Sequence, residues 1–207
     1  MDMQSLHAIA DASAALVALD PTRSQILHLL QEPDSATGVA RRLKLPRQKV
    51  NYHLRELEKH GLVTLVEERR KGNCIERIVR ASATAYVLSP DALGQLAADP
   101  SRIADRFSSA YLMATAGAAI RELAWLQSAA DKTGKRLPTL TLDAEVRFRS
   151  AEERGKFAAE LTHMLARLVS KYHDEHAAGG RRYKLIVGAY PSTRAGQARE
   201  SKHKEGL

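Results

Sequence analysis

The sequence offers almost nothing with which to crosslink or anchor the chain. Its 207 residues include a single cysteine, Cys74, so neither an internal disulfide nor a cysteine-rich zinc site can form. No apolar run reaches the roughly 20 residues that span a bilayer. The first residues also lack the basic and apolar regions of a signal peptide. These absences predict a protein of the reducing cytoplasm.

Aromatic residues and catalytic motifs are scarce as well. Aromatics make up 5% of the chain, so aliphatic side chains and alanine must fill the core. The sequence has no glycine-rich phosphate loop, no paired histidine–glutamate metal motif and no nucleophile elbow. Asp143 and Glu145 are close in sequence, but they fall on the polar side of an alternating segment. We therefore expect no enzymatic activity, no catalytic residue and no cofactor.

Positive charge is what the chain has in excess. The formal net charge is +8 and the sequence pI is about 9.7. A hydrophobic content of 44% with 27% charged residues is typical of a globular protein rather than a disordered one. A basic balance favours polyanionic partners, of which nucleic acid and anionic membranes are the common ones.

The first ninety residues predict helices followed by strands. The alanine-rich segment 3–19 predicts a helix with an apolar face of Leu6, Ile9, Leu16 and Val17. The later elements are a helix from Pro21, capped by Asp20, to about Gln31; a short helix over 37–43; a tight connection at 44–45; a helix from Pro46 to His60, ended by Gly61; and strands over 62–67, 75–80 and 83–88, with a hairpin tip at 70–73.

The second half predicts a different arrangement. A long helix rich in small residues should run from Pro100 to about Ala130. Alternating segments at 140–148 and 183–190 predict strands on either side of a helix over 150–176, joined by a right-handed crossover. Two roles remain for the aromatic and methionine side chains of the long helix: they line an apolar effector pocket, or they form part of a core, for which such spacing is more typical. These side chains are Phe107, Tyr111, Met113 and Trp125.

The helix that begins at Pro46 has two chemically different faces. Val50, Leu54 and Leu57 form an apolar stripe, and His53 beside them should pack or hydrogen-bond within the fold. The other face carries Arg, Gln, Asn and Tyr, which are suited to reading base edges and phosphates. Residues 41–55 include six basic residues and no acidic one. The candidate DNA-binding residues are Thr37, Arg42, Arg47, Gln48, Asn51, Tyr52 and Arg55, together with Arg69, Arg70 and Lys71 at the hairpin tip.

Three runs in this region resemble the ArsR-type winged helix-turn-helix family. They are LDPTRSQILHLL (19–30), VARRL (39–43) and VNYHLRELEKHGLV (50–63). The resemblance implies that the helix 46–60 enters the DNA major groove, that the hairpin 62–80 is the wing, and that flanking helices form a homodimer. Many members of that family sense metals through a cysteine pair on the recognition helix, and this helix has no cysteine.

The sequence contains few other residues that could form a metal site. His173 and His176 are three positions apart, and His163 precedes them by ten residues. Without a cysteine pair, solvated positions explain these histidines better than a zinc or nickel site. Cys74 alone is more typical of an inert small hydrophobe. We expect no bound metal.

These observations predict an α+β protein, mostly helical: a winged helix-turn-helix with flanking dimerisation helices and a small C-terminal strand-helix-strand unit. The expected parts are a dimerisation helix (1–19), a DNA-binding domain (20–90), a dimerisation or effector domain (91–191) and a disordered tail (192–207). The expected function is that of a homodimeric repressor that reads a palindromic operator in double-stranded DNA, with an unknown small-molecule effector left open. The alternative is a winged-helix module that docks a protein partner.

Overall fold

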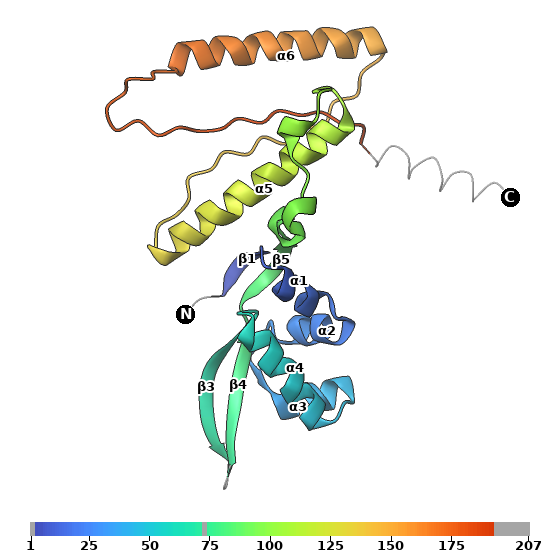
Figure 1. The fold of residues 1–207 in the computed structure, drawn as a ribbon, viewed down its shortest axis with the longest axis vertical. Helices are drawn as coiled ribbons and strands as arrows, with labels where there is room; N and C mark the ends of the chain where they lie inside the picture. The colour runs from blue at the N-terminus through green and yellow to red at the C-terminus, as the bar shows by residue number, and fades with distance from the viewer. Residues whose placement is uncertain (1–2, 72–73, 193–207) are drawn as a thin grey trace, which may run out of the picture. The chain divides into compact units, whose positions relative to one another are not determined.

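The computed structural model of the chain describes residues 3–71 and 74–192, without the side chains of Lys71 and Cys74. The chain divides after Pro138 into two units. The predicted disordered tail lies, apart from Ser192, outside the described residues. The fold is a mixed α+β arrangement with a winged helix-turn-helix near the N-terminus (Figure 1). Among the helices of the described residues, none combines the length and the apolar character that a bilayer span needs.

The described residues of the first unit form two small sheets and five α-helices. In chain order its elements are β1 (Gln4–Ile9), α1 (Ala12–Leu19), α2 (Pro21–Leu29), β2 (Asp34–Ser35), α3 (Ala36–Leu43), α4 (Arg47–Lys59), β3 (Val63–Lys71), β4 (Cys74–Ala81), β5 (Ala83–Leu88), 3₁₀ segments at Pro90–Leu96 and Pro100–Arg102, and α5 (Ser109–Lys132). One sheet is antiparallel in the order β2-β4-β3, and the other pairs β1 with β5 in parallel. The β3–β4 hairpin projects beside α3 and α4 (Figure 1).

Local signals determine where the three central helices begin and end. The Asp20 carboxylate accepts a hydrogen bond of 2.9 Å from the Arg23 N–H, and Pro21 opens α2. This bond lowers the pKa of Asp20. Lys44 adopts a left-handed conformation (φ 54°) in the tight connection between α3 and α4, and Gly61 (φ 68°) follows the end of α4. The predicted helices at 21–31, 37–43 and 46–60 are therefore confirmed to within two residues at each end.

The N-terminal segment corrects one prediction. Residues 4–9 form strand β1, not helix, and only Ala12–Leu19 is helical. The Asp11 carboxylate starts α1 by accepting a 2.8 Å hydrogen bond from the Ala14 N–H. Residues 4–9 instead pair with β5, from Gln4 opposite Ala83 to Ile9 opposite Leu88. A backbone ladder with a strand far along the chain overrides the local helix propensity, which sequence spacing cannot reveal.

The core of the first unit joins α1 to α4 with β3, β4 and β1. Its buried side chains include Ile26, Leu30, Val39, Val50, Leu54, Leu57 and Val63. Leu43 is partly buried against them. Ile9 and Val17 belong to the same core. Two of the four side chains on the predicted N-terminal apolar face therefore belong to this core rather than to a free surface.

Helix α5 begins later than predicted. Pro100–Arg102 is a short 3₁₀ segment, and α5 starts after Ser108, whose hydroxyl accepts from the Tyr111 N–H at 3.1 Å. Its small-residue face is buried at Ala114 and Ala118 and packs against the Pro90–Leu96 segment, where the Cβ position of Gly117 is 3.3 Å from Pro90. Phe107, Met113 and Trp125 are exposed rather than gathered around a pocket.

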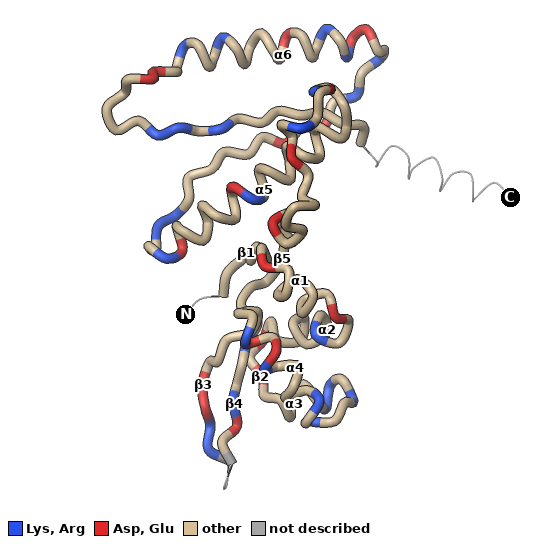
Figure 2. The backbone as a smooth tube through the Cα atoms, viewed as in Figure 1, with Lys and Arg blue, Asp and Glu red and all other residues tan. Residues whose placement is uncertain are grey.

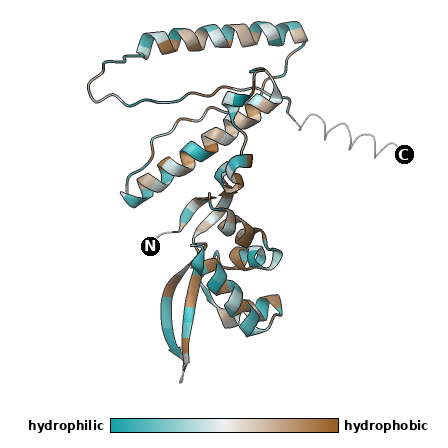
Figure 3. Cartoon of the chain, in the orientation of Figure 1, coloured by the Kyte–Doolittle hydropathy of each residue, from teal (hydrophilic) through white to brown (hydrophobic). Residues whose placement is uncertain are grey.

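The described residues of the second unit form one helix, α6 (Ala151–Tyr172), which is shorter than the predicted 150–176. Ser150 caps it, accepting from the Glu153 N–H at 3.1 Å. The predicted strands at 140–148 and 183–190 are not confirmed, because neither segment has a strand assignment among the described residues. Alternation predicts which side chains share a face, but a strand also needs a hydrogen-bonding neighbour. Hydrophobic and hydrophilic residues mix along α6 (Figure 3), and none of its residues is buried.

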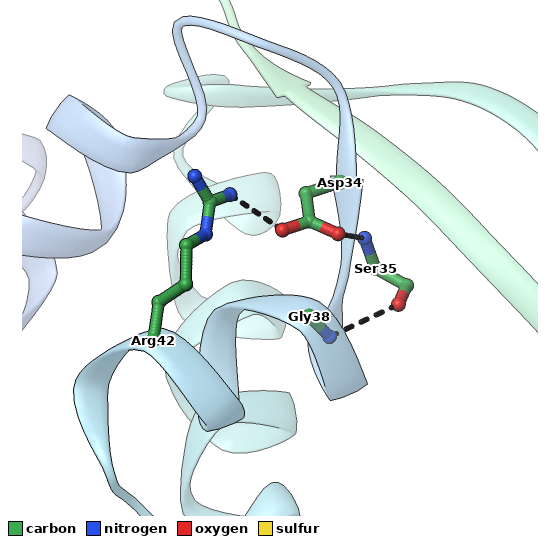
Figure 4. Close-up of polar contacts among 4 residues, drawn as sticks. All are labelled: Asp34, Ser35, Gly38 and Arg42. Atoms are coloured by element: carbon green, nitrogen blue, oxygen red, sulfur yellow. Dashed lines mark hydrogen bonds and ion pairs between the residues drawn. The ribbon is translucent and has the colours of Figure 1, made fainter.

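A polar cluster holds the start of α3 (Figure 4). The Ser35 hydroxyl accepts from the Gly38 N–H at 3.2 Å. One oxygen of Asp34 accepts from the Ser35 N–H at 2.7 Å, and the other pairs with Arg42 at 2.5 Å. A Cβ on Gly38 would overlap Asp34 Oδ1 and lie 2.5 Å from the Asp34 Cγ. A side chain at position 38 would therefore displace the Asp34 carboxylate.

The substitution Gly38→Ala should therefore destabilise the protein by about 1 kcal/mol, because the Asp34 carboxylate must leave two hydrogen-bond partners. In an Asp34→Ala background the same change should instead stabilise by up to about 1 kcal/mol, since alanine favours helix over glycine. Urea unfolding of the four proteins measures both effects. The same sign in both backgrounds would contradict the explanation.

His53 of α4 is buried and has one weak polar contact. Its Nδ1 accepts from Arg23 Nε at 3.4 Å, and its Nε2 has no hydrogen-bond partner among the described residues. Tyr52 packs edge-on against its ring. Burial lowers the pKa of His53; Asp20 opposes this shift, while Arg23 and Lys49 reinforce it. The prediction that His53 packs within the fold is confirmed.

Because of His53, the free energy of unfolding should fall as the pH drops below about 6.5, which is the pKa of a histidine in an unfolded chain. Below that pH the unfolded chain binds a proton that folded His53 resists, so protons favour unfolding. In His53→Gln the loss of unfolding free energy between pH 7.5 and 5.5 should be smaller. Burial also lowers the pKa of His7, so His7→Gln should remove a separate part of this pH-dependent loss of unfolding free energy. Identical pH profiles for wild type and His53→Gln would refute the assignment.

Candidate nucleic-acid interface

Helix α4 presents most of its predicted DNA-binding residues away from the core. Its stripe of Val50, Leu54 and Leu57 is buried, which fixes the rotation of the helix about its axis. The opposite side chains are then exposed at Arg47, Gln48, Tyr52 and Arg55, and half-buried at Asn51.

The first turn of α4 is unusual among the α-helices that the structure describes. The residue before it is Pro46, and no side chain caps its N-terminal N–H groups. Side chains of aspartate or serine cap the other five α-helices. The first turn also carries no acidic residue. Uncapped N–H groups and the helix dipole together favour an anion at this end.

A groove of about 220 Å³ lies between α3, α4 and β4. It brings together four of the predicted residues, Thr37, Arg47, Asn51 and Arg55. Their side chains come from two helices, and the tight turn at Lys44 determines how those helices are placed. Gln48 and Tyr52 do not line this groove.

Arg42 is engaged elsewhere. Its guanidinium pairs with Asp34 at the start of α3 (Figure 4). The sequence placed Arg42 among the basic residues of this region, but its partner comes from eight residues earlier. In this structure Arg42 stabilises the start of α3.

The wing, the β3–β4 hairpin, is less basic than its tip suggests. Acidic residues lie next to basic ones on both strands (Figure 2). Arg69 forms an ion pair with Glu67 of its own strand and lies opposite Glu76. Arg70 is exposed and lies opposite Ile75. The predicted contact through the Lys71 side chain lies outside what the structure describes.

The groove also contains a charged pair that the sequence did not indicate. Arg77 of β4 donates two hydrogen bonds to Glu58 of α4, from Nη1 at 3.0 Å and from Nη2 at 2.6 Å. Its Nε lies 3.7 Å from Glu68 on β3. The hydrogen bond to Glu58 raises the pKa of Arg77. The two residues are 19 positions apart, and only the packing of the wing against α4 reveals their contact.

No cluster of three or more potential metal ligands occurs in the described part of the chain. His173 and His176 follow the end of α6, and His163 lies on it. All three are exposed.

Comparison with known proteins identifies the domain that carries this groove. Residues 18–66 match the family model of a helix-turn-helix domain. No curated protein matches the sequence. Two solved structures from Mycobacterium bovis are similar to part of the chain. One is a crystal structure of a possible transcriptional regulatory protein, fragment 1–100, with 26% identity and a TM-score of 0.29 over 35% of this chain and 73% of that one.

The other is a solution structure described as the homodimeric winged helix-turn-helix DNA-binding domain of a possible ArsR-family transcriptional regulator. It has 25% identity and a TM-score of 0.29 over 35% of this chain and 63% of that one. The family match and the observed β3–β4 hairpin carry the identification. Residues 18–66 are a helix-turn-helix domain, and β3 and β4 complete it as a winged helix-turn-helix.

Proposed function

We propose that the chain is a sequence-specific DNA-binding transcriptional regulator, a homodimeric repressor that reads a palindromic operator with α4. The observation that carries the proposal is the exposed face of α4, where Arg47, Gln48, Asn51 and Arg55 project opposite a buried apolar stripe. An α-helix fits the major groove of B-DNA, where arginine recognises guanine and asparagine or glutamine recognises adenine.

The N-terminal end of α4 is the end that approaches DNA in this proposal. Its uncapped N–H groups can donate to backbone phosphate. Basic residues gather in α3, the turn and the first turns of α4 (Figure 2), whereas Glu56 and Glu58 lie near its C-terminal end. This charge asymmetry orients the helix with its first turns in the groove and its last turns away from the phosphates.

The wing contributes phosphate contacts through Arg70, which is exposed near the wing tip. Contacts to phosphate fix the register of a protein on DNA without reading sequence. Residues 20–90 thus form the DNA-binding part in our assignment, and residues 91–191 serve dimerisation or effector binding.

The homodimer rests on apolar side chains that the first unit leaves in solvent. Leu16 and Leu19 of α1 are 73% and 62% exposed, and Leu88 of β5 is 45% exposed. Leu19 and Leu88 line the same hollow, of about 370 Å³, between α1, α2 and the β1–β5 sheet. Burial of such side chains contributes about 1.5–3 kcal/mol each, and a two-fold dimer matches a palindromic site. A dimer bound across an operator represses by occupying it.

Selection of bound fragments from random duplexes tests the proposal directly, because it yields the preferred site. On that site Arg47→Ala or Asn51→Ala should weaken binding by about 1–3 kcal/mol and relax preference at one base pair. Arg70→Ala should weaken all duplexes about equally and reduce the salt dependence by about one counterion. Fluorescence anisotropy at several salt concentrations measures both.

Arg106→Ala is the matched control, because Arg106 is an exposed arginine outside the winged helix-turn-helix, and it should leave affinity unchanged. No enriched site would reject sequence-specific DNA binding and favour the protein-docking alternative, whereas an affinity that does not change with salt would reject the phosphate contacts. If Arg70→Ala changed base preference and the α4 variants did not, the wrong element would have been assigned to the major groove.

The dimer surface is tested by Leu19→Glu. A charge at this position should shift the protein from dimer to monomer at micromolar concentration and weaken binding to a palindromic duplex by about tenfold or more. Light scattering and anisotropy measure the two effects. The control Leu96→Glu alters a leucine that is 86% exposed outside the surface and should change neither. A wild-type monomer with full affinity for the palindrome would refute the dimer.

A further inference from the structure

The wing is attached to the rest of the domain by little beyond its base. Strand β2 pairs with β4 only at Val79 and Ile78. From Arg77 outward the wing is a ribbon of two strands, β3 and β4, with no third strand beside it among the described residues. A two-stranded ribbon is marginally stable and twists readily. Without another constraint, the direction of the wing relative to α4 would be poorly fixed.

An irregularity in β3 lies at the same level. The register passes from Leu65 opposite Val79 to Glu67 opposite Ile78, so Val66 is an extra residue in the ladder. A bulge bends a strand and increases its local twist. The ribbon therefore changes direction where β2 ends, and Arg77 is the first residue of β4 beyond this point.

Arg77 joins three elements at this bend. Its guanidinium donates to both carboxylate oxygens of Glu58 on α4 and approaches Glu68 on β3. Glu58 lies on the last full turn of α4, so the contact connects the ribbon to the helix whose first turns carry Arg47 and Asn51. We infer that the Glu58–Arg77 pair is a positioning contact that holds the wing at a fixed angle to the DNA-reading helix.

The exposure of the pair supports a positioning role over a stabilising one. The side chains of Arg77 and Glu58 are 42% and 32% exposed, and solvent screens the attraction of such pairs. A two-pronged hydrogen bond between guanidinium and carboxylate nevertheless imposes geometry. Loss of the pair should therefore loosen the wing without unfolding the domain.

This inference rests on the proposed DNA-binding function for its consequence. A wing at a fixed angle places Arg70 near a phosphate while α4 lies in the groove. Binding then does not lose the conformational entropy that ordering a mobile ribbon would cost. The alternative role for Arg77 is a direct phosphate contact. Glu58→Gln separates the two, because they predict opposite signs.

Glu58→Gln removes a negative charge beside the DNA-facing groove. Electrostatics alone would make this variant bind more tightly, and a phosphate-binding Arg77 would be released by it. If the pair positions the wing, Glu58→Gln should instead weaken binding about fivefold or more, as coupled neighbours do. Arg77→Lys should weaken it too, since a lysine keeps the charge but not the two-pronged geometry. Tighter binding by Glu58→Gln would overturn the inference.

Glu56→Gln is the control for charge, because it removes a carboxylate from the same helix two positions earlier, and no ion pair of Glu56 is seen among the described residues. It should leave affinity unchanged or raise it. Combination with Arg70→Ala gives a second readout. Arg70→Ala should weaken DNA binding more in the wild-type protein than in the Glu58→Gln protein. The reason is that a loosened wing already contributes less to binding. Equal effects in both backgrounds would overturn the inference.

A measurement in the free protein separates this inference from DNA binding itself. Nitroxide labels on Cys74 and on an introduced Glu32→Cys report the distance from the wing to the body of the domain, in chains diluted with unlabelled protein. The distance distribution should be narrow in the wild type and in Glu56→Gln, and broader in Glu58→Gln and Arg77→Gln. Failure of the wild type to bind DNA would reject the proposed function, whereas equal widths in all four proteins would reject the positioning contact.

Discussion

Burial of three aliphatic side chains of α4 is the constraint on which the rest of the domain depends. Val50, Leu54 and Leu57 lie in the shared core of the first unit, and rotating α4 would expose them at a cost of about 1.5–3 kcal/mol each. Because helical residues one turn apart share a face, this burial turns the Arg47 and Asn51 face outward. The packing that stabilises the fold also determines which side chains a ligand would meet.

The wing follows a different physical logic from α4. The described side chains of its distal part include none buried like that stripe. Opposite charges face each other across its ladder, with Glu68 opposite Arg77 and Arg69 opposite Glu76. Val63, Ile78 and Val79 at its base are buried, and just beyond them hydrogen-bonded charge between Arg77 and Glu58 connects it to α4. An element held in this way can be reoriented by a single substitution, whereas α4 cannot.

Short-range signals account for what was predictable. Asp20 with Pro21, Lys44 before Leu45, and Gly61 each determine a helix end through hydrogen bonds or backbone angles within a few residues. The period of Val50, Leu54 and Leu57 likewise predicted the buried face of α4, and through it the exposed candidates. The partners of the charged side chains were not predictable. Arg42 pairs with Asp34, and Arg69 pairs with Glu67. Residue type shows that a side chain is charged, but the folded positions of the charged groups decide which of them meet.

The sequence by itself determined the helix-turn-helix, because each of its boundaries depends on neighbours along the chain and its core follows one period. Tertiary structure alone decided the rest. Residues 4–9 form β1 because they pair with β5, about eighty positions away in the sequence. Glu58 contacts Arg77 because the bulged hairpin packs beside α4. The segments at 140–148 and 183–190 alternate like strands but lack a strand neighbour among the described residues. A strand is completed only by a partner, and no local pattern records where that partner lies.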